Sequence, residues 1–370
     1  MTDPRKNDAV LVTGATGTLG PYLCAELLRQ TRATVYCLVR GTDQVRAQAR
    51  LRARMRKAAA PDLESPRLRV VRGDLTEHRL GITPAEYDAL AETTSAVYHC
   101  GASTNLAAGY DDIAPLNIGG TREVLGFARH RRTKTVHHVS SLGVFAEAHS
   151  AGHPEVDEQD IPSAPMAGSI DYSGTKITSE LEVRQAATDL PVTIYRPGLI
   201  LGDSRTGATD PGELFTRILR AAITVGLAPT TAAQAPVAPV DYVARALVAL
   251  SQLPATGRTY HLIEPIPLII SDLFTHARNY GHRLDLCDTT SWRRALDDNQ
   301  AHSAAATIIS FWKSVHYLLD TPADYQAPHV HSRATRRALA SLNIPCPTSD
   351  QAFFTRVFDH LTATRVLPAL

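Results

Sequence analysis

The chain has 370 residues, of which 44% are hydrophobic and 20% charged, and this composition excludes a wholly disordered or collagen-like protein. Lysine and arginine number 38 against 37 for aspartate and glutamate, so the net charge excludes a general attraction to nucleic acid or to an acidic membrane. The five cysteines form no CxxC pair, which predicts a reducing, cytoplasmic location.

The N-terminal residues give no sign of a targeting segment. Met1 to Asp8 are polar and lead directly into an apolar run, and no apolar stretch of the chain is long enough to span a bilayer. We therefore expect neither secretion nor membrane insertion.

Short apolar runs rich in β-branched residues alternate with helix-like segments through the first half of the chain. Alternation at this length predicts βαβ units and a parallel sheet covered on both faces. We therefore expect an α/β fold with a Rossmann-like, doubly wound parallel sheet. The runs expected to form strands are Ala9 to Thr13, Thr34 to Val39, Leu68 to Val71, Ala96 to His99, Val136 to Val139 and Val192 to Tyr195.

This alternation ends after Tyr195, where loops rich in glycine, proline, alanine and threonine begin. We expect a Rossmann-like domain over residues 1–205 and a smaller, mainly helical, substrate-binding region over residues 206–370. Two late strands of the second region could rejoin the main sheet. The elements expected there are helices from Pro239 to Leu253 and from His302 to Leu319, with a strand from Arg258 to Ile263.

A glycine turn follows the first expected strand, with Gly14, Gly17 and Gly20 placed before an apolar-periodic helix. Strand, glycine turn and helix in this order predict a dinucleotide-binding site. The first glycine permits the tight turn, the second lets the backbone approach a pyrophosphate, and the third allows close helix packing. We expect contacts to the cofactor from Gly14, Thr16, Gly17, Thr18 and Leu19.

The second expected strand ends at Arg40, where a carboxylate would normally bind the ribose 2′-hydroxyl of NAD. A guanidinium there can pair with a 2′-phosphate, which favours NADP over NAD; the alternative is a solvated side chain. A basic run from Arg46 to Lys57 follows. We expect most of this run to form a solvated helix face, with Arg50 assisting Arg40 at the phosphate. The alternative is that the run forms a docking surface for an acidic partner.

Two further pairs of residues follow expected strands. Asp74 and Leu75 come after the third strand, and Gly101 and Ala102 come after the fourth. Asp74 could accept a hydrogen bond from the adenine amino group or could cap a helix, while the two small residues would let the cofactor pass close to the backbone. We expect all four beside the cofactor.

Tyr172 and Lys176 lie four residues apart, which places a phenol and an ammonium on one face of a helix. The charge of Lys176 is expected to lower the pKa of Tyr172, which makes the phenol a usable acid or base nearer neutral pH. The fifth expected strand ends at Ser140 and Ser141, and either hydroxyl could hydrogen-bond a developing oxyanion.

The order of glycine turn, serine and Tyr/Lys pair resembles the extended short-chain dehydrogenase/reductase family. The resemblance implies Ser141, Tyr172 and Lys176 as the catalytic set, with Ser141 aligning better than Ser140. It further implies that Lys176 holds the nicotinamide ribose and that Tyr172 supplies a proton to the reduced carbonyl oxygen. Pro197, Gly198 and Leu199 would line the nicotinamide end of the cofactor.

Four stretches look like thioester reductase domains, which end nonribosomal peptide and polyketide assembly lines and carboxylic acid reductases. The resemblance implies NADPH-dependent reduction of a carrier-bound acyl or peptidyl thioester to an aldehyde, in some cases onward to an alcohol. The implied partner is an acyl or peptidyl carrier protein outside this chain, which would be a stand-alone reductase or an excised terminal domain. The stretches are 98–105, 117–125, 195–207 and 239–243.

This chain departs from the resemblance at Ile177, where many relatives carry an aromatic residue, and the similarity is faint beyond Glu264. Two alternatives therefore stay open: a reductase of free ketones, aldehydes or nucleotide sugars, and a non-catalytic NADPH-binding relative. The histidine pairs at 137–138 and 329–331 lack carboxylate or cysteine partners at ligand spacing, so we expect no metal site.

Overall fold

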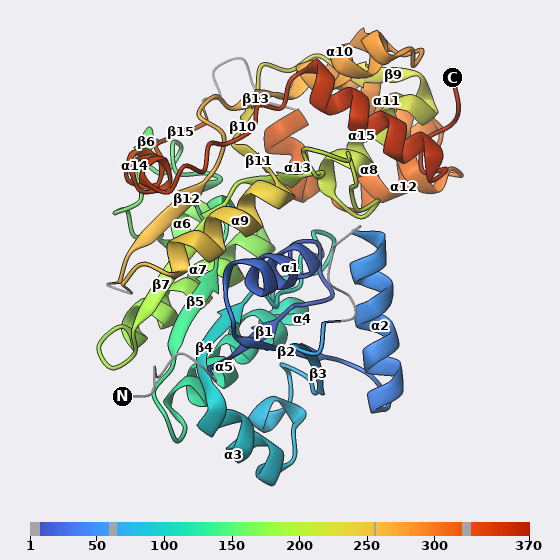
Figure 1. Cartoon of the computed structure of the whole chain (residues 1–370). Coiled ribbons are helices and arrows are strands. Elements are labelled where there is room, and N and C mark those ends of the chain that lie inside the picture. Colours follow the sequence, from blue (N-terminus) through green and yellow to red (C-terminus); the bar gives the residue numbers. More distant parts are fainter. Residues whose placement is uncertain (1–7, 59–64, 255–256, 320–326) are drawn as a thin grey trace.

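The computed structural model describes residues 8–58, 65–254, 257–319 and 327–370. Its centre is a seven-stranded parallel sheet with the order β12-β7-β5-β4-β1-β2-β3 (Figure 1). The strand order reverses beside β1, as in doubly wound folds that bind dinucleotides, so the predicted Rossmann-like α/β class is confirmed. The strands are β1 (Ala9–Thr13), β2 (Thr34–Val39), β3 (Leu68–Arg72), β4 (Thr94–His99), β5 (Thr135–Val139), β7 (Val192–Pro197) and β12 (Thr259–Leu262).

Helices cover both faces of this sheet because successive strand side chains point in opposite directions. Val10 and Val12 of β1 pack with one group of helices, and Leu11 between them packs with the other. The first group is α1 (Gly20–Gln30), α2 (Gln44–Lys57) and α9 (Val240–Ser251). The second group includes α3 (Pro84–Thr93) and α5 (Gly120–Arg129), which α7 (Asp171–Ala186) joins through contacts with α5.

A second, mainly helical region stands at one end of the sheet (Figure 1). Its apolar core includes the buried aromatic residues Phe274, Trp292, Phe353 and Phe358. The predicted helical C-terminal region is thereby confirmed. Its helices are α8 (Leu214–Val225), α10 (Ile270–Tyr280), α11 (Thr289–Asp298), α12 (Ser303–Ser310), α13 (Trp312–Leu319) and α15 (Gln351–Ala363).

Short strand pairs and helical turns connect these layers. Pairs form between β8 and β11, β9 and β14, β10 and β13, and β6 and β15. The strands are β6 (Glu155–Val156), β8 (Leu199–Leu201), β9 (Leu227–Pro229), β10 (Gln234–Ala235), β11 (Val237–Pro239), β13 (Leu268–Ile269), β14 (Asp285–Cys287) and β15 (His329–Val330). The turns are η1 (His78–Gly81), α4 (Tyr110–Ala114), η2 (Pro115–Gly119), η3 (Leu142–Phe145) and α6 (Ala164–Ala167).

The late part of the chain returns to the main sheet. Strand β12 pairs in parallel with β7, with Thr259 opposite Ile194 and Leu262 opposite Pro197. Helix α14 (Arg333–Ser341) contacts both α9 and β12. The expectation that late strands rejoin the sheet therefore holds for β12, whereas β11 pairs with β8 outside it. A domain boundary at residue 205 stays a prediction.

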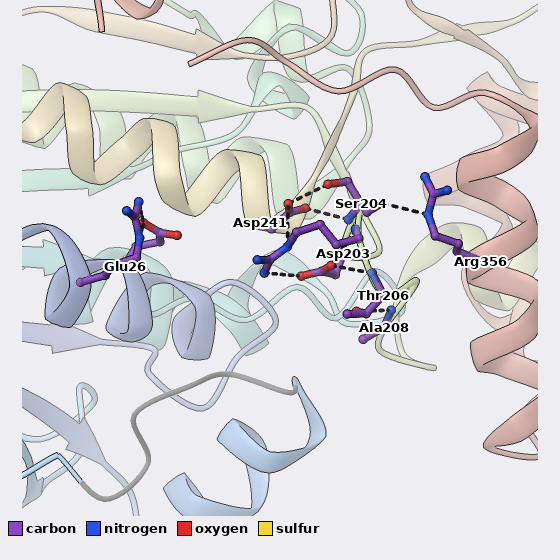
Figure 2. Close-up of polar contacts among 9 residues, drawn as sticks. Glu26, Asp203, Ser204, Thr206, Ala208, Asp241 and Arg356 are labelled. Carbon is purple, nitrogen blue, oxygen red and sulfur yellow. Dashed lines mark hydrogen bonds and ion pairs between the residues drawn. The ribbon is translucent and has the colours of Figure 1, made fainter. Parts of the chain in front are cut away.

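The Gly-Asp-Ser-Arg-Thr-Gly stretch that carries much of the resemblance forms a clasp between helices (Figure 2). The Asp203 carboxylate accepts hydrogen bonds from the backbone N–H groups of Arg205 and Thr206. Ser204 donates through its backbone N–H and its hydroxyl to Asp241 of α9, and Arg356 of α15 donates to the Ser204 carbonyl. The clasp fixes the connection from β8 to α8, which borders the site described below.

No helix within the described ranges is both long and apolar enough to cross a bilayer. The expectation of no secretion signal rests partly on residues 1–7, which lie outside the described residues. All five cysteines are free thiols, with the Cys24 and Cys37 sulfurs 3.5 Å apart in the core.

Candidate active site

A cleft of about 1470 Å³, open solvent included, lies at the carboxyl ends of β1, β4, β5 and β7. One wall is the glycine turn after β1, and the floor includes Cys100, Ser140 and Pro197 at the strand ends. The opposite wall comes from Glu213 and Leu214 at the start of α8. The cleft therefore lies between the sheet and the C-terminal region, at the edge where open α/β sheets bind ligands.

The glycine turn is built as its sequence predicts. Gly14 has a φ of +70°, and a Cβ there would lie 2.7 Å from the Cys100 carbonyl carbon. A Cβ on Gly20 would lie 2.3 Å from the Gly14 oxygen. Gly17 donates its N–H to that same oxygen at 2.9 Å. The turn thus brings the N-terminus of α1 to the cleft, where its free N–H groups favour an anion.

The structure separates the residues expected to bind a cofactor into those that line the cleft and those that lie behind it. Leu75 and Gly101 pack against each other, and a Cβ on Gly101 would lie 2.3 Å from the Leu75 Cδ1. Asp74 accepts hydrogen bonds from the Thr76 N–H and hydroxyl, and Thr16 lies in the turn outside the cleft lining. The lining residues among those expected are Gly14, Gly17, Thr18, Leu19, Ala102, Tyr172, Lys176, Pro197, Gly198 and Leu199.

The Arg50 side chain reaches the backbone of Arg40 at the end of β2. Both side chains are exposed, and Arg50 Nη1 lies 3.5 Å from the Arg40 carbonyl oxygen. Further along α2, Arg54 forms an ion pair of 2.6 Å with Asp210 in the segment before α8. The basic run of α2 therefore has two different surroundings. Arg50 is exposed beyond β2, whereas Arg54 connects α2 to the opposite wall of the cleft.

The two serines after β5 have different partners. The Ser140 hydroxyl donates to the buried Glu180 carboxylate at 2.6 Å, so it points below the cleft. The Ser141 hydroxyl accepts from the Gly143 N–H at 3.0 Å and forms a hydrogen bond with Tyr172. The geometry therefore brings Ser141, and not Ser140, to the phenol.

Lys176 lies one helical turn beyond Tyr172 on α7, with its Nζ donating to the Val139 carbonyl at 2.8 Å. Burial lowers the pKa of Lys176 to about 8, although the charges of Glu180 and Cys100 act in the opposite direction. The ammonium is therefore held at the floor of the cleft, where a ribose hydroxyl can reach it.

The expected lowering of the Tyr172 pKa by Lys176 is wrong for this structure. Burial, together with the nearby Glu213 carboxylate, raises the pKa of Tyr172 to about 12. The hydrogen bond with Ser141 is the contact that lowers it. The Lys176 ammonium is bonded to Val139 instead. At neutral pH the phenol therefore keeps its proton and can donate it.

Glu213 is a residue of this cleft that sequence reasoning missed. Its carboxylate accepts a 2.5 Å hydrogen bond from the hydroxyl of Thr18 in the glycine turn. Burial raises the pKa of Glu213 to about 7; Asp210 acts in the same direction, and Thr18, Arg217 and Arg54 act against it. Its position three residues after Asp210, at the start of the apolar-periodic α8, is the signal that could have drawn attention to it.

A buried ion pair supports the floor of the cleft. The fully buried Arg196 of β7 donates to both oxygens of Glu180, with a shortest distance of 2.5 Å. The Arg184 guanidinium and the Ser140 hydroxyl complete the contacts of this carboxylate. Although burial acts to raise it, these cations hold the pKa of Glu180 below its usual value. The pair joins β7 to the helix that carries Tyr172 and Lys176.

A second cavity meets the cleft at Ser141 and Tyr172. Leu106, Leu199 and Leu214 line both spaces, so they surround the place where the two meet. One space carries the glycine turn, and the other is mainly apolar. A carbonyl at their junction would lie beside a serine hydroxyl and a protonated phenol.

Neither histidine pair forms a metal centre among the described residues. His137 and His138 are buried in β5, where His137 stacks on Tyr98. His331 pairs with Glu155 at 3.2 Å. Burial raises the pKa of the Cys100 thiol, so Cys100 is a poor nucleophile although it lines the cleft.

Comparison with known proteins identifies the family of this chain. Residues 12–247 match the NAD-binding family model described as Male sterility protein. The chain is 32% identical to a linear gramicidin synthase of Brevibacillus parabrevis and 33% identical to an isonitrile lipopeptide synthase of Streptomyces coeruleorubidus, with 98% of this chain covered in each case. It spans 7% and 25% of the lengths of those two proteins.

Among solved structures, the terminal R domain from the myxalamid PKS-NRPS biosynthetic pathway superposes with a TM-score of 0.90 at 31% identity, covering 100% of this chain and 93% of that one. The match therefore extends through the C-terminal region as well as the sheet. The chain belongs to the NAD-binding family described as Male sterility protein, and within it to the terminal reductase domains, which are oxidoreductases of the short-chain dehydrogenase/reductase type.

Proposed function

We propose that this protein reduces an acyl or peptidyl thioester held on a carrier protein to an aldehyde, with NADPH as the reductant. The observation that carries the proposal is the junction of the cleft and the second cavity at Ser141 and Tyr172. Such a junction places a carbonyl against a proton donor while the two sides hold different ligands. The terminal R domain of the myxalamid pathway, which matches over nearly its whole length, supports the same reaction class.

The reaction balances without a covalent intermediate on the enzyme. NADPH supplies a hydride to the thioester carbonyl carbon, and the carbonyl oxygen gains a proton. The carbon–sulfur bond then breaks as the hydroxyl proton passes to the sulfur, so that the products are an aldehyde, NADP⁺ and the free thiol of the carrier. Reduction of the aldehyde by a second NADPH would give an alcohol.

The residues divide this work by position. The Tyr172 phenol, whose pKa is about 12, holds the proton that the oxygen needs, and Ser141 steadies the same oxygen by a hydrogen bond. Lys176 is positioned to bind a ribose hydroxyl of the cofactor, and so to keep its nicotinamide near the carbonyl that Tyr172 protonates. All three side chains line the cleft.

The residues present fit a phosphorylated dinucleotide. The glycine turn and the N-terminus of α1 suit the pyrophosphate, and no side chain at Gly14, Gly17 or Gly20 obstructs its approach. The exposed Arg40 and Arg50 suit a 2′-phosphate at the end of β2. This pair is our reason to propose NADPH over NADH.

The proposed partner is an acyl or peptidyl carrier protein bearing a phosphopantetheine thioester. Support comes from the two synthases, whose lengths greatly exceed the part that matches this chain. The thiol that leaves in the proposed reaction is the group such a carrier presents. The expected cytoplasmic location is part of the same proposal.

The test is NADPH oxidation by the purified chain with acyl-pantetheine thioesters, followed by mass analysis of the products. We expect one NADPH oxidised per aldehyde formed, and two per alcohol. Free ketones and nucleotide sugars tested in parallel address the alternative substrates. Turnover of those compounds together with inert thioesters would overturn the proposed function.

A further inference from the structure

The second cavity differs from the cleft in its lining. Its wall comes from η3, the start of α7, α8, α13 and β15, so both regions of the chain contribute to it. The apolar side chains that dominate the wall include Leu142, Phe145, Ile170, Leu214, Leu318 and Val330.

No aspartate, glutamate, lysine, arginine or histidine stands among the described residues that line this cavity. The adjoining cleft, in contrast, has Arg54, Lys176, Asp210, Glu213 and Arg217 in its wall. A charged group that entered the cavity would lose its hydration and gain no partner of opposite sign from these described residues. The lining therefore selects against charge on whatever enters.

Few polar side chains line this cavity, and the hydroxyls of Tyr172 and Ser173 at the start of α7 are two of them. The Ser314 hydroxyl donates to the Leu106 carbonyl at 2.8 Å, and the Ser141 hydroxyl already contacts Gly143 and Tyr172. Gln234 is exposed. A pantetheine arm carries two amides that need partners when buried, so the cavity suits it poorly. A hydrocarbon chain has no such need.

We propose that this cavity binds the acyl chain of the substrate and selects apolar, uncharged acyl groups. The proposal rests on the function proposed above. With the thioester carbonyl at Ser141 and Tyr172, the acyl chain extends past Leu214 toward Leu318 and Val330, while the amide-bearing arm stays on the side of the cleft.

The test uses three pantetheine thioesters with six-carbon acyl chains that differ in the terminal group. Hexanoyl ends in a methyl group, adipoyl in a carboxylate, and trimethylammonio-hexanoyl in a cation. We expect kcat/KM for hexanoyl to exceed that of both charged thioesters by at least about thirtyfold, because each charge must be desolvated. A charged thioester within about threefold of hexanoyl would overturn the proposal.

A charge introduced into the wall tests the location of the chain. Leu318→Lys should raise kcat/KM for adipoyl relative to hexanoyl at least about tenfold, since the ammonium would pair with the carboxylate. Leu318→Met keeps the volume and should keep the preference for hexanoyl. Val330→Lys is the second variant, because Val330 is only half-buried and a lysine there can reach water.

NADPH binding shows which variants are folded. A folded lysine variant whose ratio of adipoyl to hexanoyl is unchanged overturns the placement of the acyl chain. If neither lysine variant binds NADPH, the three thioesters on the unaltered chain decide by themselves. Absence of aldehyde from all three thioesters is a different result, because it overturns the proposed function and this inference with it.

Discussion

Thr18 of the glycine turn donates its hydroxyl to Glu213 at the start of α8, 195 positions later in the chain. This bond joins the glycine turn, where we propose that a pyrophosphate binds, to the wall supplied by the C-terminal region. A carboxylate beside that turn repels the anion expected there, whereas a protonated carboxyl group does not. The protonation of Glu213 is therefore linked to cofactor binding.

The affinity for NADPH should fall as the pH rises above about 7. The pKa of Glu213 is about 7 in the free protein, and the pyrophosphate charge raises it further in the complex. Binding therefore takes up a proton above pH 7, and the affinity loses up to about tenfold per pH unit. Calorimetric titrations across this range measure the slope.

The variant Glu213→Gln removes the titrating group, so it should flatten this dependence and bind NADPH more tightly at about pH 8. Glu26→Gln is the control, because Glu26 pairs with Arg29 on α1 and is not part of the cleft lining. An unchanged slope in Glu213→Gln would assign the pH dependence to another group.

Replacing Tyr172 by phenylalanine should lower kcat by about 10²- to 10⁴-fold, the usual contribution of a positioned acid. The affinity for NADPH should change little, because the ring that packs in the cleft remains. Stopped-flow turnover and fluorescence titration measure the two quantities. Tyr280→Phe, whose phenol bonds Asp359 on α15, is the matched control, and equal rates in the two variants would contradict the assignment.

Arg40→Ala should weaken NADPH binding by about 10- to 100-fold, since a charged hydrogen bond to phosphate contributes about 1.5–3 kcal/mol. NADH lacks the 2′-phosphate, so its affinity should stay the same. Comparison of dissociation constants for the two nucleotides measures the effect. Arg52→Ala removes an exposed arginine from the neighbouring helix; an equal loss there would point to general charge and not to a phosphate contact.

Two glutamates on α7 permit a comparison of a buried and an exposed ion pair. Glu180→Gln leaves the fully buried Arg196 without its counter-ion, so the free energy of unfolding should fall by about 3–5 kcal/mol. Glu182→Gln breaks a pair with the largely exposed Arg122 and should cost at most about 1 kcal/mol. Urea titration measures both, and similar losses would show that burial does not set the cost.

The first half of the fold could be predicted because its signals are local. The run from Ala9 to Thr13 and the glycines after it determine strand, turn and helix within a few residues, and the spacing of Tyr172 and Lys176 places them on one helical face. All of these elements appear in the structure. The role of Arg40 and Arg50 at a phosphate stays a prediction.

The other features of the site could not be predicted from the sequence, because they depend on contacts between residues that are far apart in the chain. Glu213 reaches the cleft only because the clasp at Asp203 and Ser204 fixes the connection before α8, and no periodicity reports that. The pKa of Tyr172 depends on burial and on Glu213, whereas sequence spacing shows only its neighbour Lys176. The apolar cavity likewise assembles from η3, α8, α13 and β15.

The return of β12 to the edge of β7 has a practical consequence for protein engineering. A chimera joined at residue 205 would replace the outermost strand of the recipient sheet, and the helices α9 and α14 that contact it, with those of the donor. To exchange substrate preference between such enzymes, an internal segment should therefore be replaced and the rest of the chain kept. The transplanted piece would be the segment from α10 to α13, with β12 left in the host.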